Sequence, residues 1–119
     1  MTFKCPKCQS ELQIDSCLDL PYDSRSDEIT LQILRCGGCK FSCIAIYEES
    51  RRGAIDSDCN DYNAYDVGSL EVDRLAKLIS KCPDPRNPDC PCPTHTELGR
   101  QDKGGRWIGI KSANYQNRL

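Results

Sequence analysis

The stretch CPKC at residues 5–8 has the same C-x2-C spacing as CGGC at residues 36–39, and these two stretches decide the fold. Two residues between the cysteines of a pair let the backbone turn tightly, so that both sulfurs can face one ion about 2.3 Å away. Pro6 fixes a backbone dihedral, and the Gly37-Gly38 pair permits unusual ones, as such turns require. The spacing predicts one metal site with four thiolate ligands: Cys5, Cys8, Cys36 and Cys39.

The chain between the two pairs alternates as a β-hairpin does. Apolar residues alternate with polar ones in residues 11–17 and again in residues 28–35, and the acidic, turn-rich segment 18–27 suits the hairpin loop. Such a hairpin would bring Cys36 back beside Cys8. The apolar residues that define the two strands are Leu12 and Ile14, then Ile29, Leu31 and Ile33.

A third strand is expected after the second cysteine pair, over residues 40–49. Its alternation places four side chains on one face: Phe41, Cys43, Ala45 and Tyr47. We therefore expect residues 1–50 to form a subdomain built on a three-stranded antiparallel sheet.

The order of cysteine pair, two strands, cysteine pair and strand over residues 3–49 resembles a zinc ribbon. The resemblance implies Zn²⁺ at the four cysteines, but it does not select a function, because zinc ribbons occur in proteins with many different roles. Rubredoxins share the paired-cysteine plan and bind iron, and they usually carry Gly directly after the second cysteine of each pair. Gln9 and Lys40 stand there in this chain, which favours zinc.

Residues 51–119 form the second predicted part, which is either a subdomain of its own or one compact unit with the first. Residues 49–69 are polar and turn-rich and are interpreted as a linker or long loop. A helix is expected from an N-cap at Ser69 to Cys82, where Pro83 prevents its continuation. Its apolar face has helical spacing and consists of Val72, Leu75, Ala76 and Ile79.

The stretch KCPDPRNPDCPCPTH at residues 81–95 predicts a second zinc site. Five prolines restrict the loop and so reduce the entropy that it loses when it wraps an ion. Two alternatives remain: Cys59 replaces the histidine, or Cys90-Pro91-Cys92 forms a redox pair, although no thioredoxin-like βαβ pattern surrounds it. The predicted ligands are Cys82, Cys90, Cys92 and His95, the only histidine in the chain.

The composition agrees with a small α+β protein that metal stabilises. The chain has 119 residues, of which only 38% are hydrophobic, and ten are cysteines. Small cores leave little margin over chain entropy, and metals or disulfides usually compensate. The amino terminus has no apolar run typical of a signal peptide, so we expect a cytoplasmic protein whose cysteines bind two structural Zn²⁺ ions. Of the other cysteines, Cys17 and Cys43 fall in expected strands and are interpreted as small buried hydrophobes.

No catalytic residues are predicted. His95-Thr96-Glu97 matches the H-x-E of zinc-dependent nucleobase deaminases, but in those enzymes P-C-x-x-C follows it, whereas here Pro91-Cys92 precedes it. Four protein ligands at each site predict closed structural centres, whereas a catalytic zinc site keeps one coordination position open for water or substrate. The preferred interpretation is an interaction or adaptor module for a protein partner, and a zinc enzyme is the least favoured one.

The carboxyl-terminal stretch 99–119 offers the alternative function. Its basic side chains could contact the phosphates of a nucleic acid, and an aromatic ring among them could stack on bases. The residues are Arg100, Lys103, Arg106, Trp107 and Lys111. A second interpretation makes residues 106–110 a short strand whose apolar side chains complete the core. The formal net charge of −2, which two loaded zinc sites would take to about −5, argues against indiscriminate binding to nucleic acid or anionic membranes.

Overall fold

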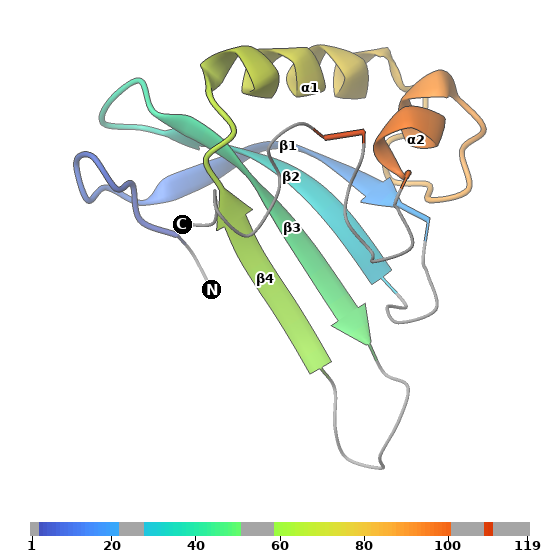
Figure 1. The fold of residues 1–119 in the computed structure, drawn as a ribbon, viewed down its shortest axis with the longest axis horizontal. Helices are drawn as coiled ribbons and strands as arrows, with labels where there is room; N and C mark the ends of the chain where they lie inside the picture. The colour runs from blue at the N-terminus through green and yellow to red at the C-terminus, as the bar shows by residue number, and fades with distance from the viewer. Residues whose placement is uncertain (1–2, 22–27, 51–58, 101–108, 111–119) are drawn as a thin grey trace.

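The computed structural model describes residues 3–21, 28–50, 59–100 and 109–110 (Figure 1). Four strands form one antiparallel sheet in the order β1-β2-β3-β4, and two helices follow them in the chain. The protein is thus a small α+β structure, as expected. The elements are β1 (Leu12–Leu20), β2 (Glu28–Cys36), β3 (Ser42–Ser50), β4 (Cys59–Tyr65), α1 (Ser69–Lys81) and α2 (Pro93–Leu98).

The prediction of a three-stranded sheet is wrong, because β4 adds a fourth strand from the segment that was interpreted as a linker. Its sequence, CNDYNAY, is rich in residues that favour turns, and this composition hides the strand. The alternation is nevertheless present: Tyr62 lies opposite Tyr47 of β3, and Ala64 lies opposite Ala45. Cross-strand pairs of this kind are what stabilise a sheet, and here they outweigh the local preference for turns.

A β-bulge in β1 divides this strand between the two faces of the sheet. Ile14 lies opposite Leu34 of β2, but Ser16 lies opposite Ile33, so Asp15 is an extra residue. Because side chains alternate along a strand, one extra residue reverses the faces beyond it. Leu12 and Ile14 therefore share one face with Cys36 and Leu34, whereas Leu18 and Leu20 share the other face with Leu31 and Ile29.

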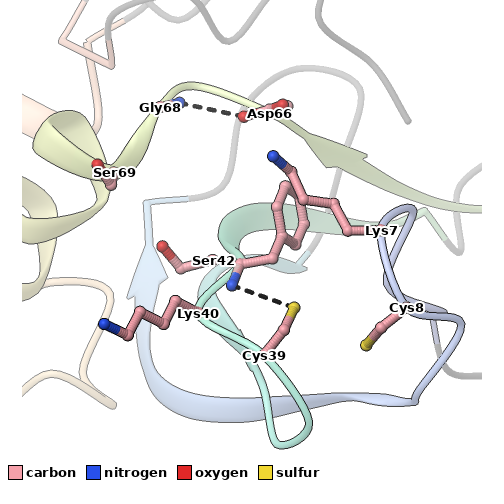
Figure 2. Close-up of a pocket in the computed structure, with 9 residues that line it drawn as sticks. Lys7, Cys8, Cys39, Lys40, Ser42, Asp66, Gly68 and Ser69 are labelled. Carbon is pink, nitrogen blue, oxygen red and sulfur yellow. Dashed lines mark hydrogen bonds between the residues drawn. The ribbon is translucent and has the colours of Figure 1, made fainter.

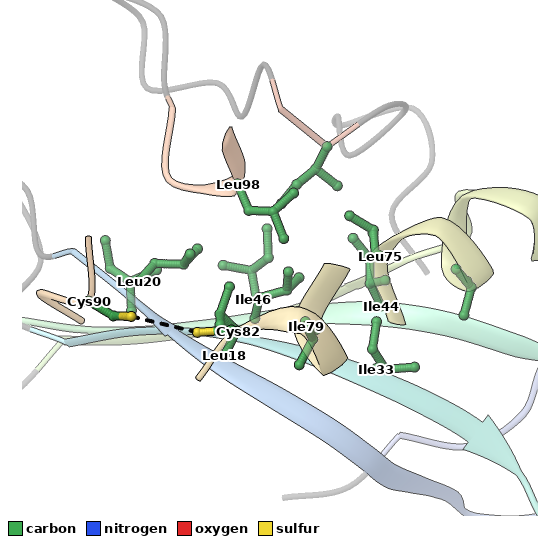
Figure 3. Close-up of a cluster of buried hydrophobic side chains, with 14 residues drawn as sticks. Leu18, Leu20, Ile33, Ile44, Ile46, Leu75, Ile79, Cys82, Cys90 and Leu98 are labelled. Carbon is green, nitrogen blue, oxygen red and sulfur yellow. Dashed lines mark hydrogen bonds between the residues drawn. The ribbon is translucent and has the colours of Figure 1, made fainter. Parts of the chain in front are cut away.

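The larger hydrophobic core lies between the sheet and the helices (Figure 3). Each large aliphatic side chain that it removes from water contributes on the order of 2 kcal/mol to folding. Two cysteines of the predicted second metal site belong to this core, so that site is embedded in the apolar interior. The buried members are Leu18, Leu20, Ile29, Leu31, Ile33, Ile44, Ile46, Val72, Leu75, Ile79, Cys82, Cys90, Leu98 and Ile110.

Helix α1 lies across this face of the sheet with its apolar stripe inward (Figure 1). The stripe is confirmed: Val72, Leu75 and Ile79 are buried. The start of the helix differs by one residue from the prediction, because the N-cap is Gly68 and no side chain caps it. At the other end, the backbone N–H of Cys82 donates to the Ile79 carbonyl, after which the chain becomes extended.

The opposite face of the sheet carries a smaller core around the first cysteine pairs. The prediction that alternate residues of β3 share a face is confirmed, since Cys43 and Ala45 are buried here and Tyr47 packs edge-on against Tyr62 at 5.7 Å. Phe3 makes a second edge contact with Tyr62 at 4.7 Å. The buried members are Cys5, Leu12, Leu34, Cys36, Phe41, Cys43, Ala45 and Ala64.

The carboxyl-terminal segment returns to the larger core through Ile110, which is 2% exposed. The guanidinium of Arg74 donates to the Gly109 carbonyl at 2.9 Å and also forms two hydrogen bonds with the buried carboxylate of Glu71. The interpretation of residues 106–110 as a short strand that completes the core is confirmed only for the burial of Ile110, because residues 109–110 form a bend. Trp107 lies outside the described residues. In the described part of the chain, neither helix has the length and apolar character that crossing a bilayer requires.

Candidate metal centres

The two C-x2-C turns, residues 5–8 and 36–39, are called the first and second knuckle. Their four cysteines lie together in space. Their sulfur atoms all fall within 4.8 Å of one another. The Sγ atoms of Cys8 and Cys36 are 3.3 Å apart, and those of Cys5 and Cys39 are 3.6 Å apart. Sulfurs that surround one ion tetrahedrally at about 2.3 Å are about 3.8 Å apart, whereas a disulfide bond is only about 2.05 Å long. The spacing therefore fits a metal ion and is too long for a disulfide.

The strand register brings the two knuckles together. Cys36 is the last residue of β2 and lies opposite Leu12, the first residue of β1. A bridge between Lys4 and Glu11 carries the pairing on toward the first knuckle. A backbone bond from Cys36 N–H to the Phe41 carbonyl, at 2.9 Å, closes the second knuckle. The predicted hairpin is therefore what places four ligands from two segments at one point.

Backbone N–H groups in each knuckle point at sulfur. Lys7 donates to Cys5 Sγ at 3.4 Å, Gly38 donates to Cys36 Sγ at 3.3 Å, and Phe41 donates to Cys39 Sγ at 3.5 Å. Hydrogen bonds to an ionised acceptor are stronger than neutral ones, and those to metal ligands fix their orientation. The first cluster therefore has the donors that would stabilise its thiolates.

Gln9 holds an unusual backbone conformation in the first knuckle, with a φ of 68°. Its N–H donates to the Cys5 carbonyl at 2.9 Å, and the Cys5 N–H donates to the Ser10 carbonyl at 2.7 Å. Glycine favours this left-handed region, so the backbone has the form that glycine would adopt although the side chain is present. The lack of glycine after Cys8 is therefore no guide to the choice between zinc and iron.

The second predicted site is also assembled, with Cys82, Cys90, Cys92 and His95 within 4.8 Å of one another. Cys82 Sγ lies 3.9 Å from Cys90 Sγ and 3.4 Å from Cys92 Sγ. The imidazole Nδ1 of His95 lies 3.3 Å from Cys82 Sγ and 3.2 Å from Cys92 Sγ. Three sulfurs and one nitrogen at these separations fit the tetrahedral coordination of one ion.

The orientation of His95 is fixed from outside the cluster. Its Nε2 lies 2.9 Å from the backbone carbonyl oxygen of Asp19 at the end of β1. A carbonyl only accepts, so Nε2 carries the proton and Nδ1 keeps its lone pair toward the sulfurs. Metal-binding histidines characteristically donate their second N–H to a carbonyl or carboxylate in this way.

Local structure explains how α2 delivers this histidine. Cys92 is the N-cap, and its sulfur accepts the His95 N–H at 3.4 Å, while Pro93 occupies the first turn. The hydroxyl of Thr94, which is 4% exposed, donates to the Leu78 carbonyl of α1 at 2.8 Å. His95 is therefore carried on a short helix that begins at Pro93.

The proline-rich loop is fastened to β1 at three further points. The Asp19 N–H donates to the Pro85 carbonyl at 2.8 Å, and the Arg86 guanidinium lies 3.3 Å from the Asp19 carboxylate. Arg86 also donates to Cys17 Sγ at 2.6 Å. These contacts were not predicted, because nothing in the spacing of residues 17–19 connects them with residues 85–95.

The pKa values of the thiols differ within each cluster. Hydrogen bonds from Ser10 lower the pKa of Cys8 to about 6. The Phe41 N–H lowers the pKa of Cys39, but desolvation and the neighbouring thiols oppose it and raise the pKa to about 12. In the second cluster, desolvation raises the pKa of Cys82 to about 11. Desolvation also acts on Cys92, but hydrogen bonds, the largest of them from the His95 backbone N–H, outweigh it and lower the pKa of Cys92 to about 6. The four sulfurs of the first cluster and the three of the second cannot all ionise without a cation nearby, and a bound metal ion would supply that charge in each cluster.

The two clusters differ in their exposure. Cys8 and Cys39 of the first are exposed and line a pocket of about 480 Å³ (Figure 2). Phe41 contributes to the same pocket, and Lys7 and Lys40 stand at its edge. In the second cluster, the exposed fractions are 8% for Cys82, 7% for Cys90 and 3% for His95.

The remaining sequence predictions have mixed outcomes. Cys43 is fully buried, as predicted, but Cys17 is only half-buried and contacts Arg86. The described second cluster contains His95, and of Cys59 only its backbone position at the start of β4 is described. From the basic stretch, Arg100 is exposed and lies 3.6 Å from the Glu97 carboxylate. Outside the described residues lie Lys103, Arg106, Trp107 and Lys111.

Known proteins do not add to this description. No family model matches the chain, and no curated protein or solved structure is detectably similar to it. The function therefore has to be argued from the two clusters and the surface around them.

Proposed function

We propose that this chain is a cytoplasmic, zinc-stabilised module that binds a protein partner and carries out no catalysis. The observation that carries the proposal is that each cluster is a complete set of four protein ligands. A catalytic zinc keeps one position for water or substrate, whereas structural zinc is fully held by protein side chains. Two complete sets therefore favour a structural role for both ions.

The donor atoms support zinc as the metal. Three thiolates and one imidazole form a standard structural zinc set, and four thiolates suit zinc or iron. The nine described cysteines are free, which agrees with a reducing compartment such as the cytoplasm. We keep the zinc-ribbon interpretation for residues 3–49, which the two knuckles and the β1–β2 hairpin support. Strand β4 lies outside this range and adds to the sheet.

Metal analysis of the purified full-length protein tests the metal part of this proposal. Native mass spectrometry with elemental analysis should find two zinc ions per chain. Chelation should unfold much of the protein, since structural zinc contributes on the order of 10 kcal/mol or more of apparent folding free energy. Iron in the first cluster, or an unchanged circular dichroism spectrum after complete chelation, would contradict a structural zinc role.

The surface beside the first cluster is our candidate for the partner site. We call it the knuckle surface and define it by Lys7, Lys40, Phe41 and Leu70. The first three line the pocket of about 480 Å³, and Leu70 follows directly after Ser69 of the same pocket. Leu70 is 86% exposed, and Ile14 at 55% is the other large exposed apolar side chain in the described ranges. The pocket lining has one aromatic side chain, two lysines and the single carboxylate of Asp66, and an exposed leucine follows it in the chain. This net positive, partly apolar surface suits a partner segment that presents apolar and acidic side chains.

Affinity purification with quantitative mass spectrometry tests the partner part. The zinc-loaded protein should recover one partner in near-stoichiometric amount, and Leu70→Asp should reduce that recovery about tenfold or more, as expected when an apolar contact with the partner is replaced by a charge. Lys77→Asp is the matched control, since Lys77 is also an exposed residue of α1 but lies away from the pocket. Both variants must first be shown to hold two zinc ions. Equal recovery by the two variants would exclude the knuckle surface.

A further inference from the structure

The two clusters offer the same chemistry to a metal but very different access to solvent. Two thiol ligands of the first cluster are exposed, whereas the second cluster contributes two cysteines to the larger core. From this contrast, we propose that the first cluster is a redox-controlled site, which peroxide oxidises with release of its zinc while the second cluster keeps its ion. This inference rests on the proposed zinc occupancy of both sites.

Access is what separates the two sites. The pocket of about 480 Å³ opens directly on Cys8 and Cys39, so a molecule as small as hydrogen peroxide can reach their sulfurs (Figure 2). Lys7, Lys40 and Asp66 line the same pocket, so the charged side chains beside these thiolates carry a net positive charge. Exposed thiolates in an electropositive setting are the cysteines that react first with oxidants.

The second cluster has the opposite surroundings. Cys82 and Cys90 pack with aliphatic side chains of the larger core, among them Leu18 and Leu20 (Figure 3). The imidazole of His95 is 3% exposed and is held by Asp19 from behind. The remaining ligand, Cys92, is half-buried, and no described pocket opens on it. Three of the four ligands are therefore closed to an oxidant in the folded protein, and the access to the fourth is restricted.

The sulfur positions in the first cluster select the product. Cys8 thiolate attacks peroxide, the O–O bond breaks, and the products are a sulfenic acid on Cys8 and one hydroxide ion. The nearest sulfur, Cys36 at 3.3 Å, then attacks the sulfenic acid as a thiolate and expels a second hydroxide ion. Two thiolates have lost two electrons, peroxide has gained them, and the zinc ion is left with two ligands and dissociates.

Oxidation would act on the knuckle surface and leave the larger core in place. The cysteines of the first cluster belong to the smaller core or to the surface, and the larger core of sheet and helices contains none of them. Lys7 and Lys40 each stand next in the chain to a ligand of the first cluster, Cys8 or Cys39. Loss of the ion would therefore displace these lysines and release a partner bound there.

The test is a titration of the two-zinc protein with hydrogen peroxide, followed by native mass spectrometry. One zinc ion should leave about tenfold or more faster than the other, as expected for ligands that differ this much in access. Trypsin then separates the cysteines, because Cys8 falls in peptide 8–25 and Cys36 in peptide 36–40. A disulfide between these two peptides should accompany the first loss.

Two ambiguities remain in the map. Cys17 shares peptide 8–25 with Cys8, and the same titration on Cys17→Ser removes this one. Cys39 shares peptide 36–40 with Cys36, and fragmentation of that peptide between Gly37 and Gly38 shows which of the two is bonded.

A chelator provides an independent measurement, and it too should remove the ion of the first cluster first. If both ions leave together, or if the first disulfide joins Cys82, Cys90 or Cys92, the inference is wrong while the proposed zinc module stands. A protein that contains no zinc would contradict the proposed function as well.

Discussion

The imidazole of His95 donates a hydrogen bond from Nε2 to the backbone carbonyl of Asp19, across 76 positions of sequence and a distance of 2.9 Å. This bond joins the ligand set of the second cluster to the end of β1. It also selects Nδ1 as the atom that faces Cys82 and Cys92. The second cluster is therefore a tertiary contact between the proline-rich loop and the sheet as well as a local metal site.

Replacing this histidine should remove one metal ion and leave the other. We expect His95→Gln to lower the zinc content from two ions to one, because an amide does not replace the imidazole as a ligand, and to disorder α2 and the loop before it. Native mass spectrometry gives the metal count, and amide hydrogen exchange locates the disorder.

Glu97→Gln is the matched control on the same short helix. It removes only a surface contact with Arg100, at 3.6 Å, and exposed pairs of this kind contribute less than about 1 kcal/mol. The control should keep two zinc ions. If His95→Gln also keeps two, His95 is not a ligand.

Gln9 provides a prediction about backbone strain. Its φ of 68° lies in the region that side chains disfavour by roughly 1–2 kcal/mol, while glycine there makes the unfolded chain more flexible. Gln9→Gly should therefore raise the free energy of unfolding by up to about 1 kcal/mol. Gln13→Gly, at an exposed position of β1, should lower the free energy of unfolding by about 0.5–1 kcal/mol. Urea unfolding of the zinc-loaded proteins measures both, and a loss of stability in Gln9→Gly would contradict the assigned conformation.

Removal of only one partner of the Arg74–Glu71 ion pair should lower the free energy of unfolding. The Glu71 side chain is only 7% exposed and the Arg74 side chain is 35% exposed, so this ion pair is partly screened. Arg74→Met takes the guanidinium from a buried carboxylate and from the Gly109 carbonyl, and we expect a loss of about 2 kcal/mol. The double variant Glu71→Leu/Arg74→Met should recover much of this loss, and urea unfolding completes the double-mutant cycle. Additive losses would show that the two side chains act independently.

Cys43 gives a pH-dependent prediction. Desolvation raises the pKa of its thiol from 9.0 to about 12, with smaller contributions from Asp66 and Cys5. The folded state thus prefers the protonated thiol, so this contribution to stability is complete below pH 9 and is lost as the pH rises from about 9 toward 12. Between pH 8 and pH 10, Cys43→Ala should lose less unfolding free energy than the wild type does. Equal losses would contradict the raised pKa.

Alkylation gives a second measure of the same burial. At pH 8 iodoacetamide should modify Cys43 only after unfolding, whereas the half-buried Cys17 should react in the folded protein. Peptide mapping separates the two, since Cys17 falls in tryptic peptide 8–25 and Cys43 in peptide 41–51.

Local features of the sequence predicted much of the two clusters. Spacing alone grouped Cys5 with Cys8 and Cys36 with Cys39, because a C-x2-C turn has few backbone solutions and the hairpin between the pairs alternates clearly. Helix α1 was predicted for a similar reason, since its apolar stripe and the following Pro83 are local signals.

What the sequence did not reveal depends on contacts between distant segments. Strand β4 is rich in Asn and Asp and becomes a strand only through its pairing with β3. The bonds from Asp19 to His95 and Arg86 join segments that no periodicity relates. The prediction that residues 18–27 form the hairpin loop is wrong for residues 18–20, because β1 continues to Leu20. The bulge at Asp15 was missed for the same reason, since only Leu12 and Ile14 then defined the face of the first strand.

The extra residue of β1 is itself open to substitution, but it makes the strand intolerant of any change in length. Its first half supplies side chains to the core beside the first cluster, and its second half supplies them to the core beside the second. Deletion of Asp15 would turn the side chains of one half toward the wrong face of the sheet, whichever half kept its place. Natural variants of this chain should therefore exchange residues freely at position 15 while keeping the count between Leu12 and Leu20 constant.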